Sequence, residues 1–472
     1  AWPRDGGAYV FLPQVCTTAP GQAGLLRANL GMYRVQMTGE AFVKNQEMGL
    51  HYQIHRGIGV HHTAYIERGE PMPVSIFVGG PPAHTLAAIM PLPEGLPEAA
   101  FAGALAGRNF RYAREGNHLI STDADFCILG EVQPGRVKPE GPFGDHLGYY
   151  SLAHDFPLLT IKKIYHRKDA IWPFTIVGRP PQEDTIFGHL IHELTAPMAP
   201  RVLPGVQGLH AVDAAGVHPL LLAVGSERYA PFSERRPMEL NTIACSILGF
   251  GQASLAKYLL LAAGEDHPPD MHNIIAFLQH ILRRMDLNRD LHFHTGTTID
   301  TLDYSGTGLN EGSKLVFVAA GPERRTLANR WNQEIGLPSF LYAAGILVLK
   351  GPAFQDYAEA SARCQEYAEL IFRAQQQTVE KIALAILVDD ISFCKEHLNN
   401  FLWVTFTRSN PSHDVYGAGA RHHFKHWQCQ EPLFIDARIK PHHAPPLEED
   451  PVVAGRMDRW FGPGRPLHSH AP

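Results

Sequence analysis

The stretch Glu140-Gly-Pro-Phe-Gly-Asp-His-Leu-Gly-Tyr-Tyr150 constrains the chain most strongly, because it carries two acids on a backbone that cannot be helical. The two glycines and the proline that separate the acids favour a tight, irregular loop. Glu140 and Asp145 are therefore expected to be held in fixed directions. The alternative is a solvated acidic turn without chemistry, and the rest of the sequence decides between the two interpretations.

Length and composition indicate a large globular protein. The chain has 472 residues, 45% of them hydrophobic, which is enough for two or three domains with their own cores. The net charge is −6, and no block of Lys and Arg suggests a nucleic-acid surface. Apolar runs such as 383–388 are too short to span a bilayer, and the N-terminus has no signal-peptide pattern, so we expect a cytoplasmic location. The first residue is Ala1 rather than Met, so we also expect a processed or truncated start.

The cysteines form no C-x-x-C pair, so we expect reduced thiols rather than a disulfide framework or a zinc site. There are six of them: Cys16, Cys127, Cys245, Cys364, Cys394 and Cys429.

The first half of the chain, from Tyr9 to Ser226, has the pattern of a β domain. Short β-branched and aliphatic runs bounded by Gly and Pro predict strands at 74–78, 159–165 and 218–224. Helical spacing of apolar residues predicts one helix at 186–194. We therefore predict a barrel-like first domain at 1–231.

The second half changes to an α/β pattern. Its clearest helix is predicted at Asp356–Gln377, where apolar residues at three- and four-residue steps form one stripe. We interpret that stripe as core-facing and without chemistry.

An internal repeat with an offset of 124 residues runs through this half. Each copy contains a lysine, an apolar strand, an acidic pair, an amphipathic helix, an arginine and an aspartate, which indicates a duplicated α/β unit. The matched pairs are Lys257 and Lys381, Glu265-Asp266 and Asp389-Asp390, Phe277-Leu278 and Phe401-Leu402, Arg284 and Arg408, and Asp290 and Asp414. We predict the two copies at 232–345 and 346–438, followed by a mobile Pro- and His-rich tail at 439–472 that could bind a metal opportunistically.

Upstream of the acidic loop, an amide, an imidazole and a carboxylate form a mixed oxygen and nitrogen set. Asn29, His55 and Glu98 suit a hard or borderline cation such as Mg²⁺ or Mn²⁺ that also contacts phosphate oxygens. Taken singly, each has a plainer interpretation as a turn Asn, a satisfied His or a solvated Glu. Arg34 could equally form a surface ion pair.

The order of the motifs resembles the UbiD-type decarboxylases, which use prenylated FMN. The series is N-x-G-x-Y-R from Asn29, H-R-G from His55, M-P-x-P-E-x-x-x-E from Met90, the acidic loop from Glu140, and Gly178-Arg-Pro-Pro-Gln-Glu183. The resemblance covers roughly residues 1–320. It departs from the family in two respects: the further N-terminal domain is essentially absent, and the second repeat copy resembles longer members associated with menaquinone biosynthesis.

The resemblance implies an α+β fold in which a split β-barrel flavin-binding domain precedes α/β domains. It places the ion, Mn²⁺ or Mg²⁺ with K⁺ as a further candidate, on Asn29, His55 and Glu98. It places catalysis on Arg34, Glu140 and Asp145. It places further cofactor contacts on Met32, Met90, Pro91 and, at the phosphate, Lys257.

The implied function is reversible, non-oxidative decarboxylation of an aromatic or α,β-unsaturated acid. No side chain can accept the electrons of the broken C–C bond, so a cofactor must. Arg34 would grip the substrate carboxylate, Glu140 would orient Arg34, and Asp145 would return a proton to carbon, with His146 either tuning Asp145 or remaining a plain loop histidine. A flavin prenyltransferase would supply the cofactor, and we expect a homo-oligomer.

Other functions fit the sequence less well. A non-catalytic flavin-binding protein is the main alternative, against which the intact Arg34, Glu140 and Asp145 argue. There is no G-x-S-x-G elbow of a hydrolase, and Gly57-Ile-Gly59 and Gly249-Phe-Gly251 lack the third glycine of a nicotinamide-binding fingerprint. The substrate stays open among a polyprenyl hydroxybenzoate, a naphthoate of quinone biosynthesis and small aromatic or heteroaromatic acids.

Overall fold

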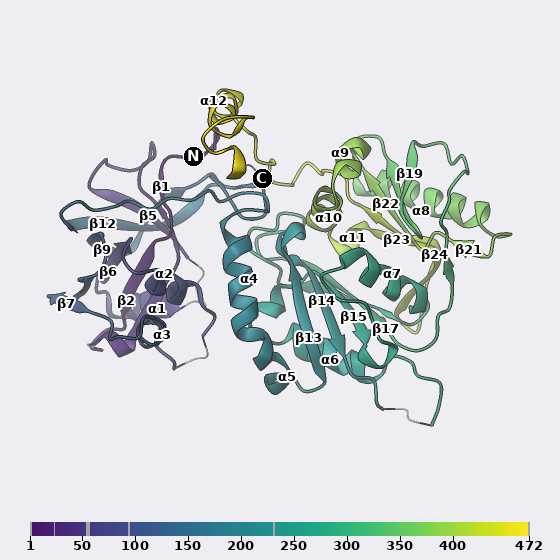
Figure 1. Cartoon of the computed structure of the whole chain (residues 1–472), viewed down its shortest axis with the longest axis horizontal. Coiled ribbons are helices and arrows are strands. Elements are labelled where there is room, and N and C mark those ends of the chain that lie inside the picture. The colour runs from purple at the N-terminus through teal and green to yellow at the C-terminus, as the bar shows by residue number, and fades with distance from the viewer. Residues whose placement is uncertain (1, 23, 53–56, 93–94, 230–231, 471–472) are drawn as a thin grey trace. The chain divides into compact units, whose positions relative to one another are not determined.

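The computed structural model describes residues 2–22, 24–52, 57–92, 95–229 and 232–470 (Figure 1). The chain divides into two compact units. Unit 1 comprises Ala1–Gly178 and Pro445–Pro472, and unit 2 comprises Arg179–Ala444.

Unit 1 is built on one eight-stranded antiparallel sheet with the order β1-β4-β5-β12-β9-β6-β2-β3. In the described residues no ladder joins β1 to β3, so this sheet does not close into a barrel. Its strands are β1 (Tyr9–Val10), β2 (Gln14–Thr18), β3 (Ala28–Gly31), β4 (Arg34–Gln36), β5 (Glu47–His51), β6 (Met72–Val78), β9 (Phe126–Glu140) and β12 (His154–His166).

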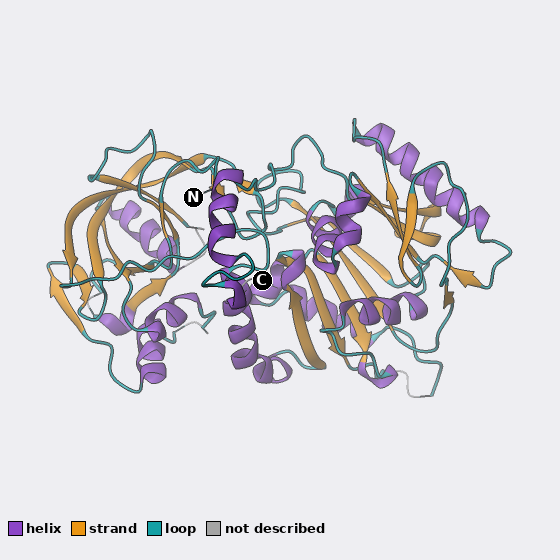
Figure 2. Cartoon of the chain, turned by 45° about the horizontal axis from the view of Figure 1, so that its top comes forward, coloured by secondary structure: helices purple, strands orange, loops and turns teal. Residues whose placement is uncertain are grey.

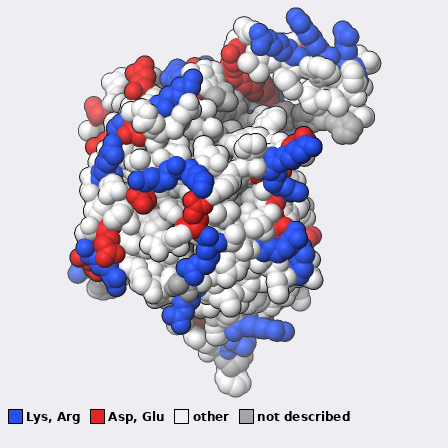
Figure 3. All heavy atoms as spheres, turned by 90° about the vertical axis from the view of Figure 1, so that its left-hand side faces the viewer, with Lys and Arg blue, Asp and Glu red and all other residues white. Residues whose placement is uncertain are grey.

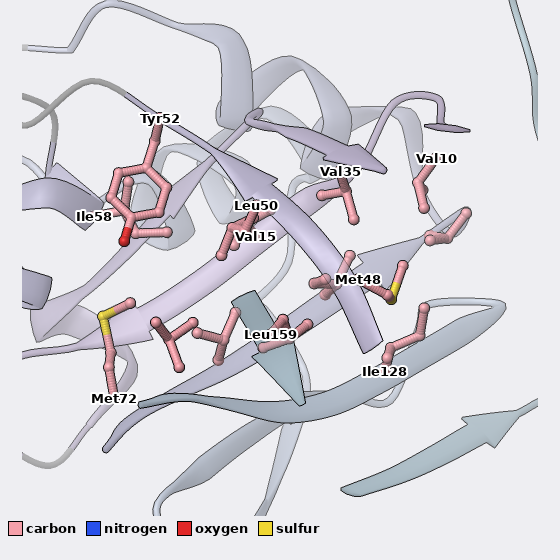
Figure 4. Packing of buried hydrophobic residues seen from close by; sticks show 14 of the residues in the cluster. Val10, Val15, Val35, Met48, Leu50, Tyr52, Ile58, Met72, Ile128 and Leu159 are labelled. Atoms are coloured by element: carbon pink, nitrogen blue, oxygen red, sulfur yellow. The ribbon is translucent and has the colours of Figure 1, made fainter. Parts of the chain in front are cut away.

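Both faces of this sheet are covered where β6 crosses it. Because successive side chains of a strand point to opposite faces, Met72 and Ile76 enter one cluster while Phe77 enters another. The first cluster fills the inside of the curved sheet, where side chains of β5 meet those of β9 and β12 (Figure 4). The second lies under α2 and α3. Burial on both faces explains why all seven residues of β6 are buried.

Four helices and two short hairpins complete unit 1. The helices are α1 (Gly57–Arg68), α2 (Pro82–Ile89), α3 (Glu98–Ala106) and α12 (Pro451–Phe461), and the hairpins are β7 (Tyr112–Glu115) with β8 (His118–Ser121) and β10 (Phe143–Gly144) with β11 (Tyr150–Ser151). The predicted tail contains the helix α12, which Asp450 caps by accepting from the N–H of Val452 at 2.8 Å.

Unit 2 contains two five-stranded sheets with the same architecture. In each sheet the three central strands run parallel to one another, and an antiparallel strand lies at either edge. Helices lie along both sheets (Figure 2). The first sheet, β13-β14-β15-β17-β16, consists of β13 (Val206–Val212), β14 (Val217–Gly225), β15 (Tyr258–Ala263), β17 (Gly312–Ala319) and β16 (Leu291–Thr297). The second, β19-β20-β22-β24-β23, consists of β19 (Ser339–Ala343), β20 (Ile346–Lys350), β22 (Leu384–Val388), β24 (His426–Asp436) and β23 (Val415–His423).

The helices between the strands of unit 2 follow a similar order in both halves. One α-helix lies between the second and third strands of each sheet, and the fourth strand follows one α-helix in the first half and three in the second, whereas α4 (Glu183–Thr195) and α5 (Ala199–Val202) precede the first sheet only. The others are α6 (Glu239–Leu248), α7 (Ile274–Arg284), α8 (Tyr357–Ala374), α9 (Ile391–Glu396), α10 (Leu398–Thr407) and α11 (Pro411–Asp414), and a small ladder joins β18 (Thr326–Leu327) to β21 (Glu380–Lys381).

Residues matched by the 124-residue offset occupy equivalent places in the two halves. Asp290 directly precedes β16 and accepts from the N–H of Asp286 at 2.8 Å, whereas Asp414 directly precedes β23 and accepts from the N–H of Asn410 at 2.6 Å. Each aspartate thus stabilises the turn four residues upstream, which gives the shared sequence order a shared structural role.

The structure confirms the helices predicted at 186–194 and 356–377, which are α4 and α8, and the strands at 74–78, 159–165 and 218–224. The predicted boundary at residue 231 differs from the structural one, because β14 pairs in parallel with β15 and so belongs to unit 2. Residues 445–472 return to unit 1, where the N–H of Tyr150 donates to the carbonyl of Pro445 at 2.9 Å.

All six cysteines are free thiols. Among the described residues, no helix is both long and apolar enough to cross a membrane. On the face of unit 1 shown in Figure 3, positive and negative side chains are interspersed.

Candidate active site

The pleat of the unit 1 sheet brings Arg34 and His51 together. They are direct partners across β4 and β5, and their neighbours Val35 and Leu50 are fully buried in the core cluster. Because side chains alternate along a strand, this burial holds Arg34 and His51 on the opposite face.

Glu140 meets Arg34 on that face. Glu140 is the last residue of β9, and its side chain is fully buried. Arg34 grips it with two parallel hydrogen bonds, from Nε to Oε1 at 2.9 Å and from Nη2 to Oε2 at 2.6 Å. Such a bidentate pair fixes the plane of both groups.

The β10–β11 hairpin supplies the second acid. Phe143 pairs with Ser151, and the N–H of Asp145 donates to the carbonyl of Tyr149 at 3.0 Å, which closes the turn. Arg34 Nη1 donates to Asp145 Oδ2 at 2.8 Å and to Ser151 Oγ at 3.1 Å. Gly141, which leads into the hairpin, has φ +95°, a conformation that suits glycine.

Arg34 is therefore almost fully bonded. Four of its five N–H groups have oxygen acceptors, and the fifth lies beside Nδ1 of His51, which is also 3.1 Å from Glu140 Oε2 and can donate a hydrogen bond to it. The ring of His51 stacks on Phe156 with centroids 3.7 Å apart. One guanidinium thus holds a buried glutamate, an aspartate, a serine and a histidine.

The charges of this cluster stabilise both carboxylates. Burial alone raises the pKa of Glu140, but the hydrogen bond from His51 and the charge of Arg34 hold that pKa below its ordinary value. Burial likewise raises the pKa of Asp145, but the hydrogen bond from His146 and the charge of Arg34 outweigh it, so the pKa is lowered. Burial and the nearby Arg34 lower the pKa of His51. At neutral pH both acids are ionised and His51 is uncharged.

Two of the three predicted metal ligands lie side by side. Glu98 Oε2 accepts from the N–H of Leu30 at 3.3 Å, directly after Asn29. His55 lies outside the described residues. Gly57 lies against Asn29, since a Cβ at Gly57 would meet Asn29 Oδ1 at 2.1 Å.

The side chains of Glu98 and Asn29 suit a bound cation that lies next to a second, oxygen-rich group. Burial raises the pKa of Glu98, and no Lys, Arg or His side chain in the described part of the chain offsets its charge. Asn29 Nδ2 is buried without an acceptor among the described residues. A divalent cation would satisfy Glu98, and an oxygen-rich group such as a phosphate would satisfy Asn29.

The remaining predicted cofactor contacts lie in two parts of the chain: Met32, Met90 and Pro91 in unit 1, and Lys257 in unit 2. The N–H of Met32 donates to the carbonyl of Ala88 at 2.9 Å, which joins the end of β3 to the end of α2, where Met90 and Pro91 follow. Lys257 lies in unit 2 and is 1% exposed, with Nζ 2.7 Å from both Asp303 Oδ2 and Ser305 Oγ. Burial lowers the pKa of this lysine.

The sequence did not predict the roles of His51 and Ser151. Both contact Arg34 through strand pairing between distant segments. The only local signals were the place of Ser151 directly after the acidic loop and the position of His51 four residues before His55.

Family models match most of the chain. Residues 1–180 match the UbiD model, described as the 3-octaprenyl-4-hydroxybenzoate carboxy-lyase Rift-related domain. Residues 185–319 match the UbiD_C model, the C-terminal domain of the same carboxy-lyases.

Relatives from Chlamydia match nearly the full chain. An uncharacterized protein of Chlamydia muridarum is 37% identical over 473 residues, which cover 98% of this chain and 76% of that protein. A Chlamydia pneumoniae protein, named as one of the subunits of a 4-hydroxybenzoate decarboxylase, is 38% identical over 470 residues, with 98% and 75% covered.

Solved structures share the fold at low sequence identity. The vanillic acid decarboxylase of Sedimentibacter hydroxybenzoicus in its closed form matches with a TM-score of 0.59 and 20% identity, over 71% of this chain and 68% of that one. The UbiD-class enzyme HmfF of Pelotomaculum thermopropionicum, in complex with FMN, matches with a TM-score of 0.55 and 18% identity, over 70% and 69%.

Replacing Arg34 tests the cluster through its pH dependence. Arg34→Leu leaves two buried carboxylates without their cation, so we expect the free energy of unfolding at pH 7 to fall by about 3–5 kcal/mol. In the wild type both carboxyl pKa values lie below their ordinary 4.5 and 3.8, so the stabilisation is complete above those values and is lost as pH falls through the lowered ones. In the variant both acids can protonate at higher pH, so its deficit should shrink between pH 8 and pH 5.

Urea unfolding of both proteins at the two pH values measures this difference. Arg136→Leu is a matched control, because Arg136 pairs with Glu47 but is 49% exposed, and its loss should cost less than about 1 kcal/mol. An Arg34→Leu deficit that is equal at pH 5 and pH 8 would contradict the electrostatic account.

Proposed function

Because the chain belongs to the UbiD family of carboxy-lyases, we propose that it catalyses the non-oxidative, reversible decarboxylation of an aromatic or α,β-unsaturated carboxylic acid with prenylated FMN. The observation that carries the proposal is the buried cluster of Arg34, Glu140 and Asp145. The names of the Chlamydia pneumoniae relative and of the Sedimentibacter structure, both decarboxylases of aromatic acids, support the reaction class.

The cofactor would lie beside Asn29 and Glu98. It supplies the electron sink that no side chain offers. We propose that Asn29, His55 and Glu98 hold a divalent ion, Mn²⁺ or Mg²⁺, against its phosphate, with K⁺ as a further candidate ion. FMN and prenylated FMN in two of the solved structures with this fold support a flavin.

Arg34 would bind the substrate carboxylate by exchanging partners. Four of its five N–H groups have oxygen acceptors, so an incoming carboxylate that takes two N–H groups must replace at least one acceptor. Glu140 is fully buried and holds two N–H groups, whereas Asp145 is 13% exposed and holds one. We therefore propose that the substrate replaces Asp145 at Nη1 while Glu140 keeps the guanidinium oriented.

The same exchange would convert Asp145 from an ionised carboxylate into a protonated proton donor. While Arg34 contacts it, Asp145 is held ionised and cannot donate a proton. Losing this contact removes a positive charge and leaves a buried carboxyl, so its pKa rises and it can take up a proton. Asp145 would then deliver that proton to the substrate carbon after CO₂ leaves.

One observation favours the alternative of a non-catalytic flavin-binding protein. Four of the five N–H groups of Arg34 are bonded to oxygens of its own chain, as in a purely structural ion cluster. The two functions differ in one measurable property, which is turnover of a carboxylic acid.

The proposal includes further parts of the predicted organisation. A flavin prenyltransferase would supply the cofactor, and the substrate could belong to quinone biosynthesis. We expect a homo-oligomer; the name of the Chlamydia pneumoniae relative refers to a multi-subunit enzyme.

We also propose that the unit 1 sheet is a split barrel and that the two sheets of unit 2 arose by duplication. The equal strand order of the two sheets supports the duplication.

The metal assignment predicts linked losses. His55→Ala and Glu98→Gln should each lower the content of divalent metal and of flavin together, because the ion neutralises phosphate charge. Metal analysis and the flavin absorbance of the same preparation measure both. Glu115→Gln, at a partly exposed residue of β7, should change neither. Full flavin content in a folded His55→Ala protein would refute the assignment.

The assignment of Lys257 to the cofactor phosphate predicts different effects in the two repeat copies. Lys257→Ala should weaken flavin retention, and Lys381→Ala should not. Lys257 also forms a buried ion pair with Asp303, so its loss could act on stability as well as on the cofactor. Combining Lys257→Met with Asp303→Asn removes both charges of this pair and so separates the structural role from the proposed phosphate contact. The double variant should recover stability but not flavin retention. Wild-type retention in the folded double variant would show that Lys257 is purely structural.

Turnover tests the function itself. Protein co-produced with a flavin prenyltransferase should decarboxylate at least one member of a panel of aromatic acids, or carboxylate its product in concentrated bicarbonate. Asp145→Asn keeps the shape of the donor without its proton, so turnover should fall by about 10²–10⁴-fold at unchanged flavin occupancy. Wild-type turnover in Asp145→Asn would exclude it as the donor, and no turnover of any acid would favour the non-catalytic alternative.

A further inference from the structure

Three histidines from separate segments of unit 2 lie close together, and none of them belongs to the sites described so far. His192 lies near the end of α4, His210 lies in β13, and His272 precedes α7. The ring centroids of His210 and His272 are 4.3 Å apart, and that of His192 lies 6.1 Å and 6.3 Å from them.

These separations are close to those of three imidazoles around one metal ion. With metal–nitrogen distances of about 2.0–2.1 Å, tetrahedral ligation places ring centroids about 5 Å apart. The observed values lie on both sides of this distance. The ligand nitrogens of the three rings do not yet converge, and His192 must approach the other two rings for one ion to bind all three. No side-chain hydrogen bond holds His192 in the described part of the chain, and His272 is 61% exposed, so both rings can adjust.

The ring nitrogens of the group are available. Neither His192 nor His210 forms a side-chain hydrogen bond with another residue in the described part of the chain. An imidazole nitrogen that forms no other hydrogen bond can bind a metal ion.

Asp270 orients the third ring. Its Oδ1 accepts a hydrogen bond from Nδ1 of His272 at 2.9 Å, which selects the tautomer whose Nε2 can ligate. This carboxylate–histidine arrangement is the one that supports zinc-bound histidines in metalloproteins. The other charged group near the cluster is Glu193, which pairs with His189 at 3.3 Å.

We propose that His192, His210 and His272 form a binding site for a borderline divalent metal such as Zn²⁺, with Asp270 as the positioning carboxylate and a solvent molecule as the fourth ligand. Three imidazoles favour Zn²⁺, Co²⁺ or Ni²⁺ over the Mg²⁺ or Mn²⁺ of an oxygen-rich site. The ion would join α4 to β13 and to the segment before α7, and so stabilise unit 2. This site is independent of the proposed decarboxylation.

Cobalt binding tests the site on the full-length protein. After chelator dialysis, Co²⁺ is titrated in excess Mg²⁺, which occupies an oxygen-rich site, and visible absorption is recorded. The wild type should bind one equivalent with the intense bands of tetrahedral Co²⁺, which Zn²⁺ abolishes. His210→Ala and His272→Ala should lose this equivalent, whereas His422→Ala, at an exposed strand position, should keep it.

Asp270→Asn provides a second variant that does not depend on removing a ligand. Both Asp270 and His272 are largely exposed, so these variants should fold. Asp270→Asn should weaken Co²⁺ binding by about 10–100-fold, the usual effect of losing such a partner. Zn²⁺ should raise the melting temperature of the wild type but not of His272→Ala. Equal Co²⁺ affinity and spectra in the wild type, His272→Ala and Asp270→Asn would overturn the proposal.

Discussion

The guanidinium of Arg34 is the constraint on which the buried ion cluster of unit 1 depends. A buried guanidinium needs acceptors for five N–H groups, and here they come from segments more than a hundred residues apart in the sequence. To supply them, β9 must end at Glu140 and the following hairpin must bring Asp145 and Ser151 back over β4. The geometry of the loop follows from this demand as much as from its glycines and proline.

The rigidity of the sheet makes such a cluster useful for chemistry. Arg34 and His51 lie on neighbouring strands whose adjacent residues are locked in the core, so the cation cannot move far when one of its partners leaves. In the proposed mechanism its charge is then available to a substrate carboxylate. The two acids differ in burial, and in that mechanism the more buried Glu140 would orient Arg34 while Asp145 would change its protonation state.

Local patterns in the sequence predicted the long elements and the residues of the motifs. Asp356–Gln377 was recognisable as a helix, and Glu140 and Asp145 as held acids, because spacing and turn residues suffice for these. The sequence could not predict partners made by strand pairing, such as His51. It also could not predict that β14 joins unit 2 or that the residues after Ala444 return to unit 1, because those placements depend on contacts between distant segments.

The exchange of Asp145 for a substrate carboxylate on Arg34 is the central claim, and proton uptake on ligand binding tests it most directly. Calorimetric titration of the flavin-loaded protein with benzoate, in buffers of different ionisation enthalpy near pH 6, gives the number of protons taken up. We expect an uptake of up to about one proton per benzoate in the wild type and none in Asp145→Asn, because the released carboxyl protonates. Benzoate binding without proton uptake in the wild type, or with equal uptake in Asp145→Asn, would contradict the account.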